Sequence, residues 1–473
     1  MSLQSTFRDP TGALFDHEGR ILRLVKPGRV EGFEAFVRSA LGQGLVERGR
    51  LVGTRAIALD AVPADLRELE GTWFEHDRLA FVSVPAEWSA AMLAAAALHT
   101  LDLADELLKS GKILKDATPA NILFEGARPV FVDVPSIEDI VAGQDVWMAR
   151  NQFETTFILP LLAQLELDCP LQWSLADPAR GLSHEQAAAL YGPRRWLGSR
   201  RIRQVALPAT IGRRARGHAV HSAASPSKAG HSNLERTRYV LAHSLGRLRS
   251  AILDIVKLLE RRQSHWSAYT GERSHYSTPD LVAKRELVAE VLDRGAPRWT
   301  LDIGANTGEF SRLAVTKGSQ VVAVDSDEIS AGAIFSSAQQ AGAPIHALVV
   351  DISRPTPATG WRNSEAKSFV HRATGRFDLA LMLAVGHHLR VTAGVPLHQV
   401  LELGLQLGGG SLLFEFVPTD DPMFQTIARG RNADYSDNTV ENCRALLAGS
   451  GVIELERLLP NGRTLFWARR QRR

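Results

Sequence analysis

The sequence is poor in cysteine and in long hydrophobic runs. Cys169 and Cys443 are the only cysteines in 473 residues, too few for a disulfide framework, so nothing indicates an oxidising compartment. The most apolar stretch, residues 90–101, is interrupted by His99 and is too short for a membrane span. Residues 1–15 lack the basic start and the apolar run of a signal peptide. We therefore expect a cytoplasmic protein with no membrane span.

Net charge is also low, at +3, but the charges are unevenly placed. Residues 194–249 hold thirteen Arg or Lys and one acid, Glu235, whereas the rest of the chain carries a net −9. This basic segment is a solvated linker, an element that docks on acidic parts of the chain, or a site for an anionic partner. Its interleaved aromatic residues are few, chiefly Trp196 and Tyr239, which makes nucleic acid the less favoured partner without excluding it.

Changes in hydrophobic periodicity divide the chain into three parts. Residues 1–190 mix predicted strands and helices, with one helix expected over 31–48, which indicates an α+β domain. In 191–268 we expect the basic linker, with a mobile stretch at 212–232 and a long helix that starts at the N-cap Asn233. Strands and helices alternate over 269–473, which predicts an α/β domain with a doubly wound parallel sheet. Its strands are expected at 299–303, 320–324, 346–350, 377–383, 411–417 and 463–468.

The alternating region lacks the G-x-G-x-x-G turn of NAD-binding proteins. WTLDIGANTGEF (299–310) instead leads from a strand into a helix with the spacing D-x-G-x-x-x-G, and Asp325 ends the next strand. Glycines let the backbone approach a ligand, and an acid at this place accepts hydrogen bonds from a ribose diol, which indicates an adenosine cofactor. Together with VVDIS (349–353) and FDLALMLAVGHHL (377–389), these residues resemble the class I S-adenosylmethionine-dependent methyltransferases.

The resemblance covers about 269–473 and implies a Rossmann-like sheet whose final strand is inserted antiparallel. It implies S-adenosylmethionine as the cofactor, with its adenine near Asp351. Another doubly wound domain, such as an NAD-binding one, is the alternative. The residues expected at the cofactor are Asp302, Gly304, Asn306, Gly308, Asp325, Ser326, Asp351, Ile352 and Tyr276.

Three further residues are candidates for catalysis. Methyl transfer depends on holding the sulfonium in line with the acceptor, and an oxygen or nitrogen acceptor also needs a base. His387, His388 and Glu415 are expected near the ends of the fourth and fifth strands, where ligands bind in open α/β sheets. His388 is the candidate base, with a packing role as the alternative for such histidines. Glu415 is either catalytic or a buried acid that positions a loop.

Several segments point to a narrower group. LDIGANTGEFSRLA, the Gly360-Trp361 pair, LAVGHHL and EFVPTDD together resemble a bacterial methyltransferase group that includes nodulation-associated members. That group also carries a long N-terminal extension. The resemblance does not supply a substrate.

A second motif lies in the N-terminal part. In KDATPANILFEGARPVFVDVPS (115–136), Asp116 precedes Asn121 by five residues, and Asp133 follows a predicted hairpin. This resembles protein kinases and aminoglycoside phosphotransferase-like enzymes, and the resemblance implies that Asn121 and Asp133 hold Mg²⁺ for ATP. Lys26 is the candidate small-lobe lysine, with Glu34 or Glu47 as its partner. No glycine-rich loop precedes Lys26 and Asp-Val-Pro replaces Asp-Phe-Gly, so the site is degenerate and binding-only, or an active phosphotransferase.

Taken together, the sequence predicts a two-domain S-adenosylmethionine-dependent methyltransferase. Its acceptor is expected to be a small molecule, a sugar or a carrier-bound metabolite, with the kinase-like domain recognising or gating the substrate. One alternative is a bifunctional enzyme with an active N-terminal phosphotransferase. A second alternative is a nucleic-acid or protein-binding module with a non-catalytic cofactor site. No feature of the sequence indicates an oligomeric state.

Overall fold

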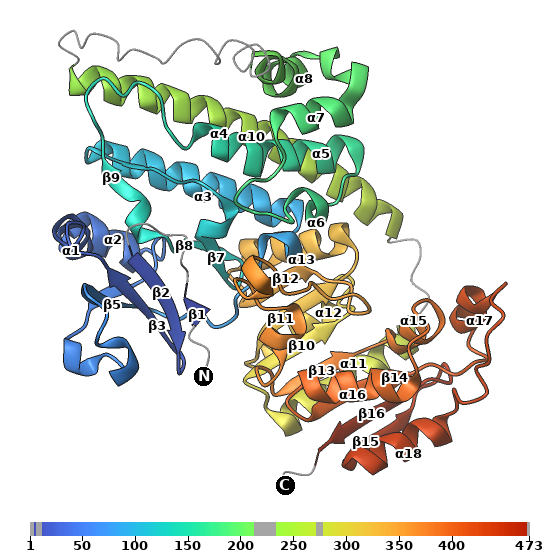
Figure 1. Ribbon diagram of the computed structural model, residues 1–473. Coiled ribbons are helices and arrows are strands. Elements are labelled where there is room, and N and C mark those ends of the chain that lie inside the picture. Colours follow the sequence, from blue (N-terminus) through green and yellow to red (C-terminus); the bar gives the residue numbers. More distant parts are fainter. Residues whose placement is uncertain (1–3, 6–11, 212–232, 271–277, 471–473) are drawn as a thin grey trace. The chain divides into compact units, whose positions relative to one another are not determined.

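The computed structural model describes residues 4–5, 12–211, 233–270 and 278–470, and the side-chain surroundings of 12–211, 233–261 and 279–470 (Figure 1). The chain forms two compact units, the first made of residues 1–125 and 129–260 and the second of residues 126–128 and 261–473. Each unit has its own secondary structure and its own core.

The first unit begins with a five-stranded antiparallel sheet of order β1-β2-β3-β5-β4. The turn between β2 and β3 places Glu18 and Gly19 at φ 48° and 84°. Phe15, Leu22 and Trp73 pack into the core on one side of this sheet. The strands are β1 (Gln4–Ser5), β2 (Gly12–His17), β3 (Arg20–Val25), β4 (Thr54–Ala56) and β5 (Thr72–His76).

Two helices stand where the periodicity predicts one. α1 (Val30–Arg38) ends and α2 (Ala40–Glu47) begins at Ser39, whose ψ of 153° is extended. The Ser39 hydroxyl accepts a hydrogen bond from the Gly42 amide at 3.0 Å. The prediction of a continuous helix over 31–48 was wrong because a serine inside a periodic pattern can cap a new helix.

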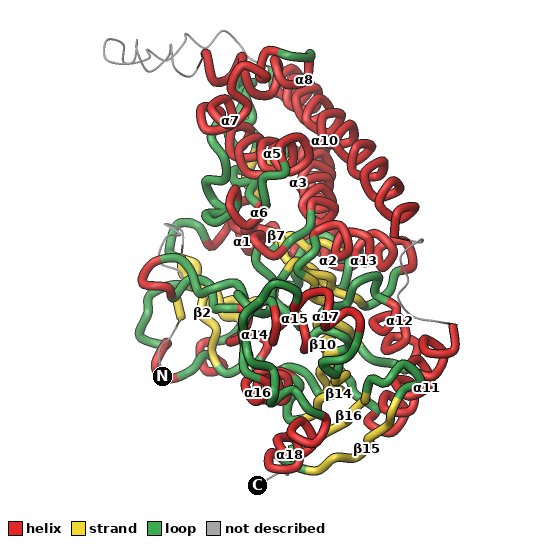
Figure 2. Tube along the Cα trace, turned by 90° about the vertical axis from the view of Figure 1, so that its right-hand side faces the viewer, coloured by secondary structure: helices red, strands yellow, loops and turns green. Residues whose placement is uncertain are grey.

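The rest of the first unit is mainly helical, as the red segments around α3, α5, α7 and α10 in Figure 2 show. The predicted hairpin that precedes Asp133 is confirmed as β7 and β8. A π-helical turn, Glu154–Ile158, joins α4 to α5. The elements are α3 (Ala90–Lys109), β6 (Lys112–Leu114), β7 (Ile122–Glu125), β8 (Arg128–Phe131), β9 (Ile137–Asp139), α4 (Arg150–Phe153), α5 (Leu159–Leu167), α6 (Leu171–Ser174), α7 (His184–Tyr191), α8 (Ser199–Arg201) and α10 (Leu234–Thr270).

The described parts of the basic segment belong to the first unit. Residues 191–211 and 234–260 thus differ from the separate linker expected over 191–268. The physical reason is an apolar stripe on α10, in which five residues at helical spacing are buried: Leu241, Leu245, Leu248, Ile252 and Ile255. The expected cap is confirmed, since Asn233 Oδ1 accepts the Glu235 amide at 2.9 Å. The mobile stretch expected at 212–232 lies outside the described residues.

The second unit is built on a seven-stranded sheet of order β12-β11-β10-β13-β14-β16-β15. The five strands from β12 to β14 are parallel, and β16 is antiparallel to both β14 and β15. This confirms the predicted parallel sheet with a final antiparallel strand. The strands are β10 (Trp299–Ile303), β11 (Gln320–Asp325), β12 (Ile345–Val349), β13 (Leu379–Met382), β14 (Ser411–Phe416), β15 (Val452–Leu458) and β16 (Thr464–Arg469).

Helices connect these strands and pack on the sheet. α13 begins at Asp327, whose carboxylate accepts the Ser330 amide at 2.8 Å, and ends at Gly342 with φ 60°. This cap and this left-handed glycine explain why the helix begins and ends where it does. The helices are α11 (Thr278–Gly295), α12 (Glu309–Thr316), α13 (Glu328–Ala341), α14 (Phe369–Ala373), α15 (Gly386–Val391), α16 (Leu397–Leu407), α17 (Pro422–Ala428) and α18 (Val440–Ser450).

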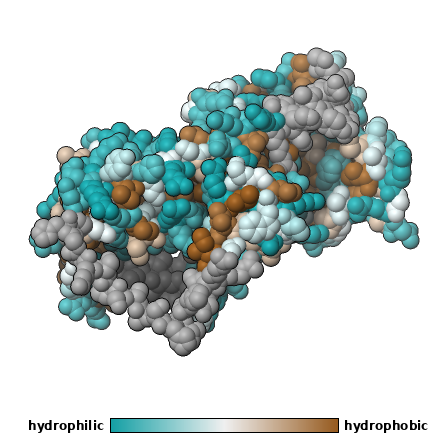
Figure 3. All heavy atoms as spheres, turned by 90° about the horizontal axis from the view of Figure 1, so that it is seen from above, coloured by the Kyte–Doolittle hydropathy of each residue, from teal (hydrophilic) through white to brown (hydrophobic). Residues whose placement is uncertain are grey.

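Surface hydropathy and helix composition test whether the described residues include a membrane-spanning helix. The face in Figure 3 is largely hydrophilic, with hydrophobic residues in small groups between polar ones. Within the described ranges, each helix is too short or too polar to cross a bilayer.

Candidate active site

The turn between β10 and α12 forms the centre of the candidate cofactor site. Its residues Gly304 and Asn306 have positive φ, at 74° and 48°. The amides of Gly304 and of the residue after it donate to the Val324 carbonyl of β11, at 2.8 and 3.1 Å. A Cβ on Gly304 would lie 2.3 Å from Val385 Cγ2 in the loop after β13. Glycine is required here on both conformational and steric grounds, and the turn lies where β11 and β13 flank the central strand.

Asp325 ends β11 beside this turn. The Asn306 amide donates to Asp325 Oδ2 at 2.7 Å, and the Asp327 amide donates to Oδ1 at 2.9 Å. Burial raises the pKa of Asp325, an effect that these amides and the Ser326 amide oppose. Each carboxylate oxygen keeps acceptor capacity beyond its amide contact, so the fixed carboxylate can accept two neighbouring hydroxyl groups. This donor and acceptor set fits the ribose of an adenosine cofactor.

Asp302 and Gly308 fix the turn from within the protein. Asp302 is 2% exposed, and its Oδ2 accepts the Ser311 hydroxyl of α12 at 2.6 Å. Burial raises the pKa of Asp302 to about 6; the Ser311 hydroxyl opposes the rise, and the nearby Asp325 carboxylate adds to it. Gly308 has φ 74°, and a Cβ there would lie 2.9 Å from Ile334 Cγ1. Both residues therefore hold the turn in place through contacts with the rest of the second unit.

The residues expected near the adenine follow β12. Asp351 is exposed, and its Oδ1 accepts both the amide and the hydroxyl of Ser353, at 2.9 and 2.6 Å. Ile352 is 8% exposed and offers an apolar surface beside it. Tyr276 lies outside the described residues.

The two candidate histidines lie in α15, with ring centroids 4.2 Å apart. His387 is 4% exposed, and neither of its ring nitrogens has a hydrogen-bond partner among the described residues. Burial lowers the pKa of His387 to about 3, and the charges of His388 and Arg463 add to this. His388 opens to solvent; burial and then Arg463 lower its pKa, whereas Asp325 opposes the shift. Because a base works best with a pKa near the operating pH, His388 suits proton transfer better than His387.

Glu415 takes part in a buried ion network. Its Oε2 lies 2.5 Å from Lys284 Nζ on α11, and its Oε1 lies 3.2 Å from Arg463 Nη1. Arg463 also donates through Nε to Asp421 Oδ2 at 2.8 Å, and Asp421 caps α17. Glu415 itself is 0% exposed. The network joins β14 and the loop before β16 to α11 and α17, which favours the positioning role for Glu415.

Sequence reasoning did not identify Lys284, Arg463 or Asp421. Lys284 and Arg463 belong to no motif of fixed spacing, and Asp421, the last residue of the EFVPTDD segment, was not singled out within it. The sequence does place Asp421 directly before a proline, which is typical of the start of a helix. That pattern predicts a helix cap and gives no indication of an ion network.

In the first unit, the structure describes all three residues of the second motif. Asp116 Oδ1 accepts the Gln152 amide group at 3.4 Å. Asn121 Oδ1 accepts the Thr118 hydroxyl at 3.5 Å, and Asn121 Nδ2 is buried with no hydrogen-bond partner among the described residues. Across those residues, no cluster of three or more His, Cys, Asp or Glu side chains has an arrangement that would hold a metal.

A buried arginine reaches Asp133 from the sheet. Arg23 on β3 is 6% exposed, and its Nη2 lies 4.0 Å from Asp133 Oδ1. Its Nε donates to His76 Nε2 at 3.0 Å. Lys26, the candidate small-lobe lysine, is exposed just beyond the end of β3. Its candidate partner Glu34 instead forms an ion pair with Arg38 at 2.5 Å.

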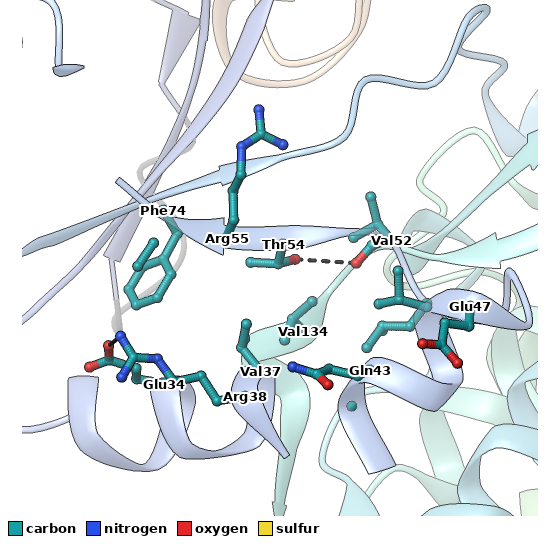
Figure 4. Close-up of a pocket in the computed structure, with 14 residues that line it drawn as sticks. Glu34, Val37, Arg38, Gln43, Glu47, Val52, Thr54, Arg55, Phe74 and Val134 are labelled. Carbon is teal, nitrogen blue, oxygen red and sulfur yellow. Dashed lines mark hydrogen bonds and ion pairs between the residues drawn. The ribbon is translucent and has the colours of Figure 1, made fainter. Parts of the chain in front are cut away.

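A cavity of about 490 Å³ lies between α1, α2 and β4 in this unit. Figure 4 shows the side chains of Val37, Phe74 and Val134 around it, with Arg38 and Glu47 on the helices. Val134 follows Asp133 directly, so the cavity borders the second motif.

Comparison with known proteins gives one relative along almost the whole chain. No protein-family profile matches the sequence. Over 466 residues, 98% of this chain and 94% of the relative, the sequence is 30% identical to nodulation protein NoeA of Rhizobium meliloti (strain 1021).

Solved structures with similar folds match a smaller share. The N-methyltransferase NodS of Bradyrhizobium japonicum WM9 has 15% identity and a TM-score of 0.31, over 41% of this chain and 99% of NodS. Magnesium protoporphyrin IX methyltransferase of Synechocystis PCC 6803, with bound SAM, has 15% identity and a TM-score of 0.30, over 42% of this chain and 86% of that protein. The bifunctional kinase-methyltransferase WbdD has 19% identity and a TM-score of 0.30, over 42% of this chain and 40% of WbdD, so less than half of WbdD is matched.

The family assignment rests on the match along the whole chain, and the fold on the sheet of the second unit. The parallel strands β12 to β14 and the antiparallel β16 are those that the methyltransferase resemblance implies, and the D-x-G-x-x-x-G turn lies between β10 and α12. The chain belongs to the family of nodulation protein NoeA, and its second unit has the fold of S-adenosylmethionine-dependent methyltransferases.

Proposed function

We propose that the chain is an S-adenosylmethionine-dependent methyltransferase whose cofactor binds between the β10–α12 turn and Asp325. The observation that carries the proposal is the Asp325 carboxylate, which two backbone amides hold at the carboxyl edge of the sheet. When bound, the cofactor supplies an electrophilic methyl group. The protein's part is to orient it, and the closely packed Gly304 and the fixed Asp325 carboxylate would serve that orientation.

The acceptor in this proposal is a small molecule, a sugar or a carrier-bound metabolite. His388 is the proposed base, because it opens to solvent beside the cofactor edge and is neutral near pH 7. Its imidazole would take a proton from an oxygen or nitrogen acceptor as the methyl group is transferred. Glu415 has a positioning role in this scheme, since both of its oxygens face buried cations.

For the first unit, we propose a degenerate kinase-like domain that recognises or gates the substrate. The antiparallel sheet and the hairpin that leads to Asp133 support the kinase-like arrangement. The Arg23 guanidinium beside Asp133 supports the binding-only role, because it supplies positive charge where Mg²⁺ would be needed. Active phosphotransfer is the second candidate function.

The cofactor assignment is tested by titrating S-adenosylhomocysteine into wild-type protein and Asp325→Ala in a calorimeter. We expect the variant to lose at least about tenfold in affinity, because the ribose hydroxyls lose their charged acceptor. Asp293→Ala is the matched control, since that carboxylate is 57% exposed and pairs with Lys317. Equal affinity of Asp325→Ala and wild-type protein would overturn the assignment.

The two roles of the first unit are separated by ATP titrations with and without Mg²⁺. The binding-only role predicts no magnesium-dependent ATP binding at about millimolar concentration. Magnesium-dependent binding that Asp133→Ala abolishes would instead support phosphotransfer.

A further inference from the structure

A second pocket lies wholly within the first unit, among helices of the basic segment. It has a volume of about 260 Å³ and is lined by α10, by residues 200–208 and by the α4–α5 region. Figures 1 and 2 both show α8 beside α10 in this part of the unit. The pocket is separate from the residues proposed for methyl transfer, all of which lie in the second unit.

Four arginines and two acids line this pocket, and two of the arginines contact an acid within the fold. Arg150 Nε lies 2.9 Å from Glu154 Oε1. Arg200 Nη1 lies 3.5 Å from Glu166 Oε1. The lining acid Asp254 is in turn paired with Lys257 at 3.8 Å. These three contacts leave Arg203 and Arg247 as the lining arginines with no acidic partner among the described residues.

Arg203 and Arg247 have no acid within ion-pair distance in the described part of the chain. Arg203 Nε donates only to the Ser199 carbonyl, at 3.3 Å. Both arginines are exposed to solvent. Residues 212–232, which follow in the sequence, contain no Asp or Glu. Other arginines of the segment do find acids: Arg201 pairs with Glu166 and Arg249 with Asp102. The two uncompensated cations are thus a local feature of the pocket.

We propose that this pocket binds the phosphomonoester group of a small, hydroxyl-bearing metabolite. A phosphomonoester carries about −1.5 to −2 charge at pH 7 and matches two arginines, whereas one carboxylate would neutralise only one. Ser244 and Gln204 also line the pocket and offer a hydroxyl and an amide to sugar-type hydroxyl groups. The lining contains no aromatic side chain on which a nucleic-acid base could stack.

The test is calorimetric titration of the full-length protein with glucose 6-phosphate, inorganic phosphate, gluconate and glucose. We expect glucose 6-phosphate to bind most tightly, inorganic phosphate more weakly, and gluconate and glucose weakest. Arg203→Gln and Arg247→Gln are each expected to lower the affinity for glucose 6-phosphate by about tenfold or more. Arg180→Gln is the matched control, because Arg180 is 87% exposed, forms an ion pair with Asp177 and lies outside the pocket.

Arg203→Lys keeps the positive charge and therefore controls for a loss of binding that is caused by misfolding. Its expected affinity for glucose 6-phosphate lies between those of wild-type protein and Arg203→Gln. Four results would overturn the proposal. They are gluconate binding as tight as that of glucose 6-phosphate, unchanged affinity in both glutamine variants, no saturable phosphate binding up to about 10 mM, and a single-stranded oligonucleotide that binds when the monoester does not.

Discussion

At the residue scale, Asp302 shows how a buried acid makes stability depend on pH. Burial raises its pKa in the folded protein from 3.8 to about 6. Between these values the folded state binds more protons than the unfolded state, so stability falls as pH rises through this window. Above pH 6 the full cost of the buried charge is present. Asp302 therefore lowers the stability of the second unit at neutral pH.

We expect Asp302→Asn to raise the free energy of unfolding at pH 7.5 by up to about 3 kcal/mol, since a shift of one pKa unit corresponds to about 1.4 kcal/mol. Asparagine can still accept the Ser311 hydroxyl. The gain should shrink toward pH 4, where the aspartic acid is protonated. Urea unfolding at the two pH values measures this, with Asp293→Asn as the exposed control. A gain of equal size at both pH values would contradict the assigned cause.

Some residues of the candidate site could be predicted from the sequence and others could not. Gly304 and Asp325 could be found because they belong to a motif of fixed spacing and meet at one edge of a parallel sheet. The partners of Glu415 could not, because Lys284 and Arg463 come from segments far apart in the chain and only the folded core brings them together. Arg23 was missed for a related reason: an arginine on a strand is usually exposed, and its burial depends on His76 and Asp133.

At the element scale, the Glu415 network holds β14 and the loop before β16 to α11 and α17. We expect Glu415→Gln to lower the free energy of unfolding by about 3–5 kcal/mol, because it leaves Lys284 and Arg463 with one buried negative charge fewer. Chemical denaturation followed by circular dichroism measures the loss.

Glu456→Gln is the matched control for this change. Glu456 on β15 pairs with Arg444 on α18, and these side chains are 31% and 43% exposed. Its loss should stay within about 1 kcal/mol, as for partly exposed pairs. If the two glutamine variants are equally stable, Glu415 does not have the positioning role described above.

The elements themselves were predicted well where the hydrophobic pattern is local. β10 and α13 lie where their alternation and caps place them. β15 was missed because its residues are mostly partly buried or exposed, so its sequence lacks the continuous hydrophobic run of β12 or β13. The break at Ser39 shows the opposite case, in which a cap interrupts a continuous periodic pattern.

At the scale of the whole molecule, two separate cores predict two unfolding steps. We expect differential scanning calorimetry to show two transitions, of which saturating S-adenosylhomocysteine raises only one. Ligand at a hundred times its Kd stabilises the state that binds it by about 2.7 kcal/mol. In Asp325→Ala, whose affinity is expected to be at least about tenfold lower, the same ligand concentration should stabilise the second unit by about 1.4 kcal/mol or less. One transition that shifts as a whole would show that the units unfold together.

The position of β16 has a consequence for how the chain is made. This strand lies between β14 and β15 in the sheet, although it follows both in the sequence. While the ribosome adds residues 417–463, the edge of β14 has no neighbour and β15 has no strand to pair with. A nascent chain stalled in this interval would carry an open edge that invites pairing with other chains. Folding of the second unit is therefore expected to finish after translation of β16, whereas the first unit can fold much earlier.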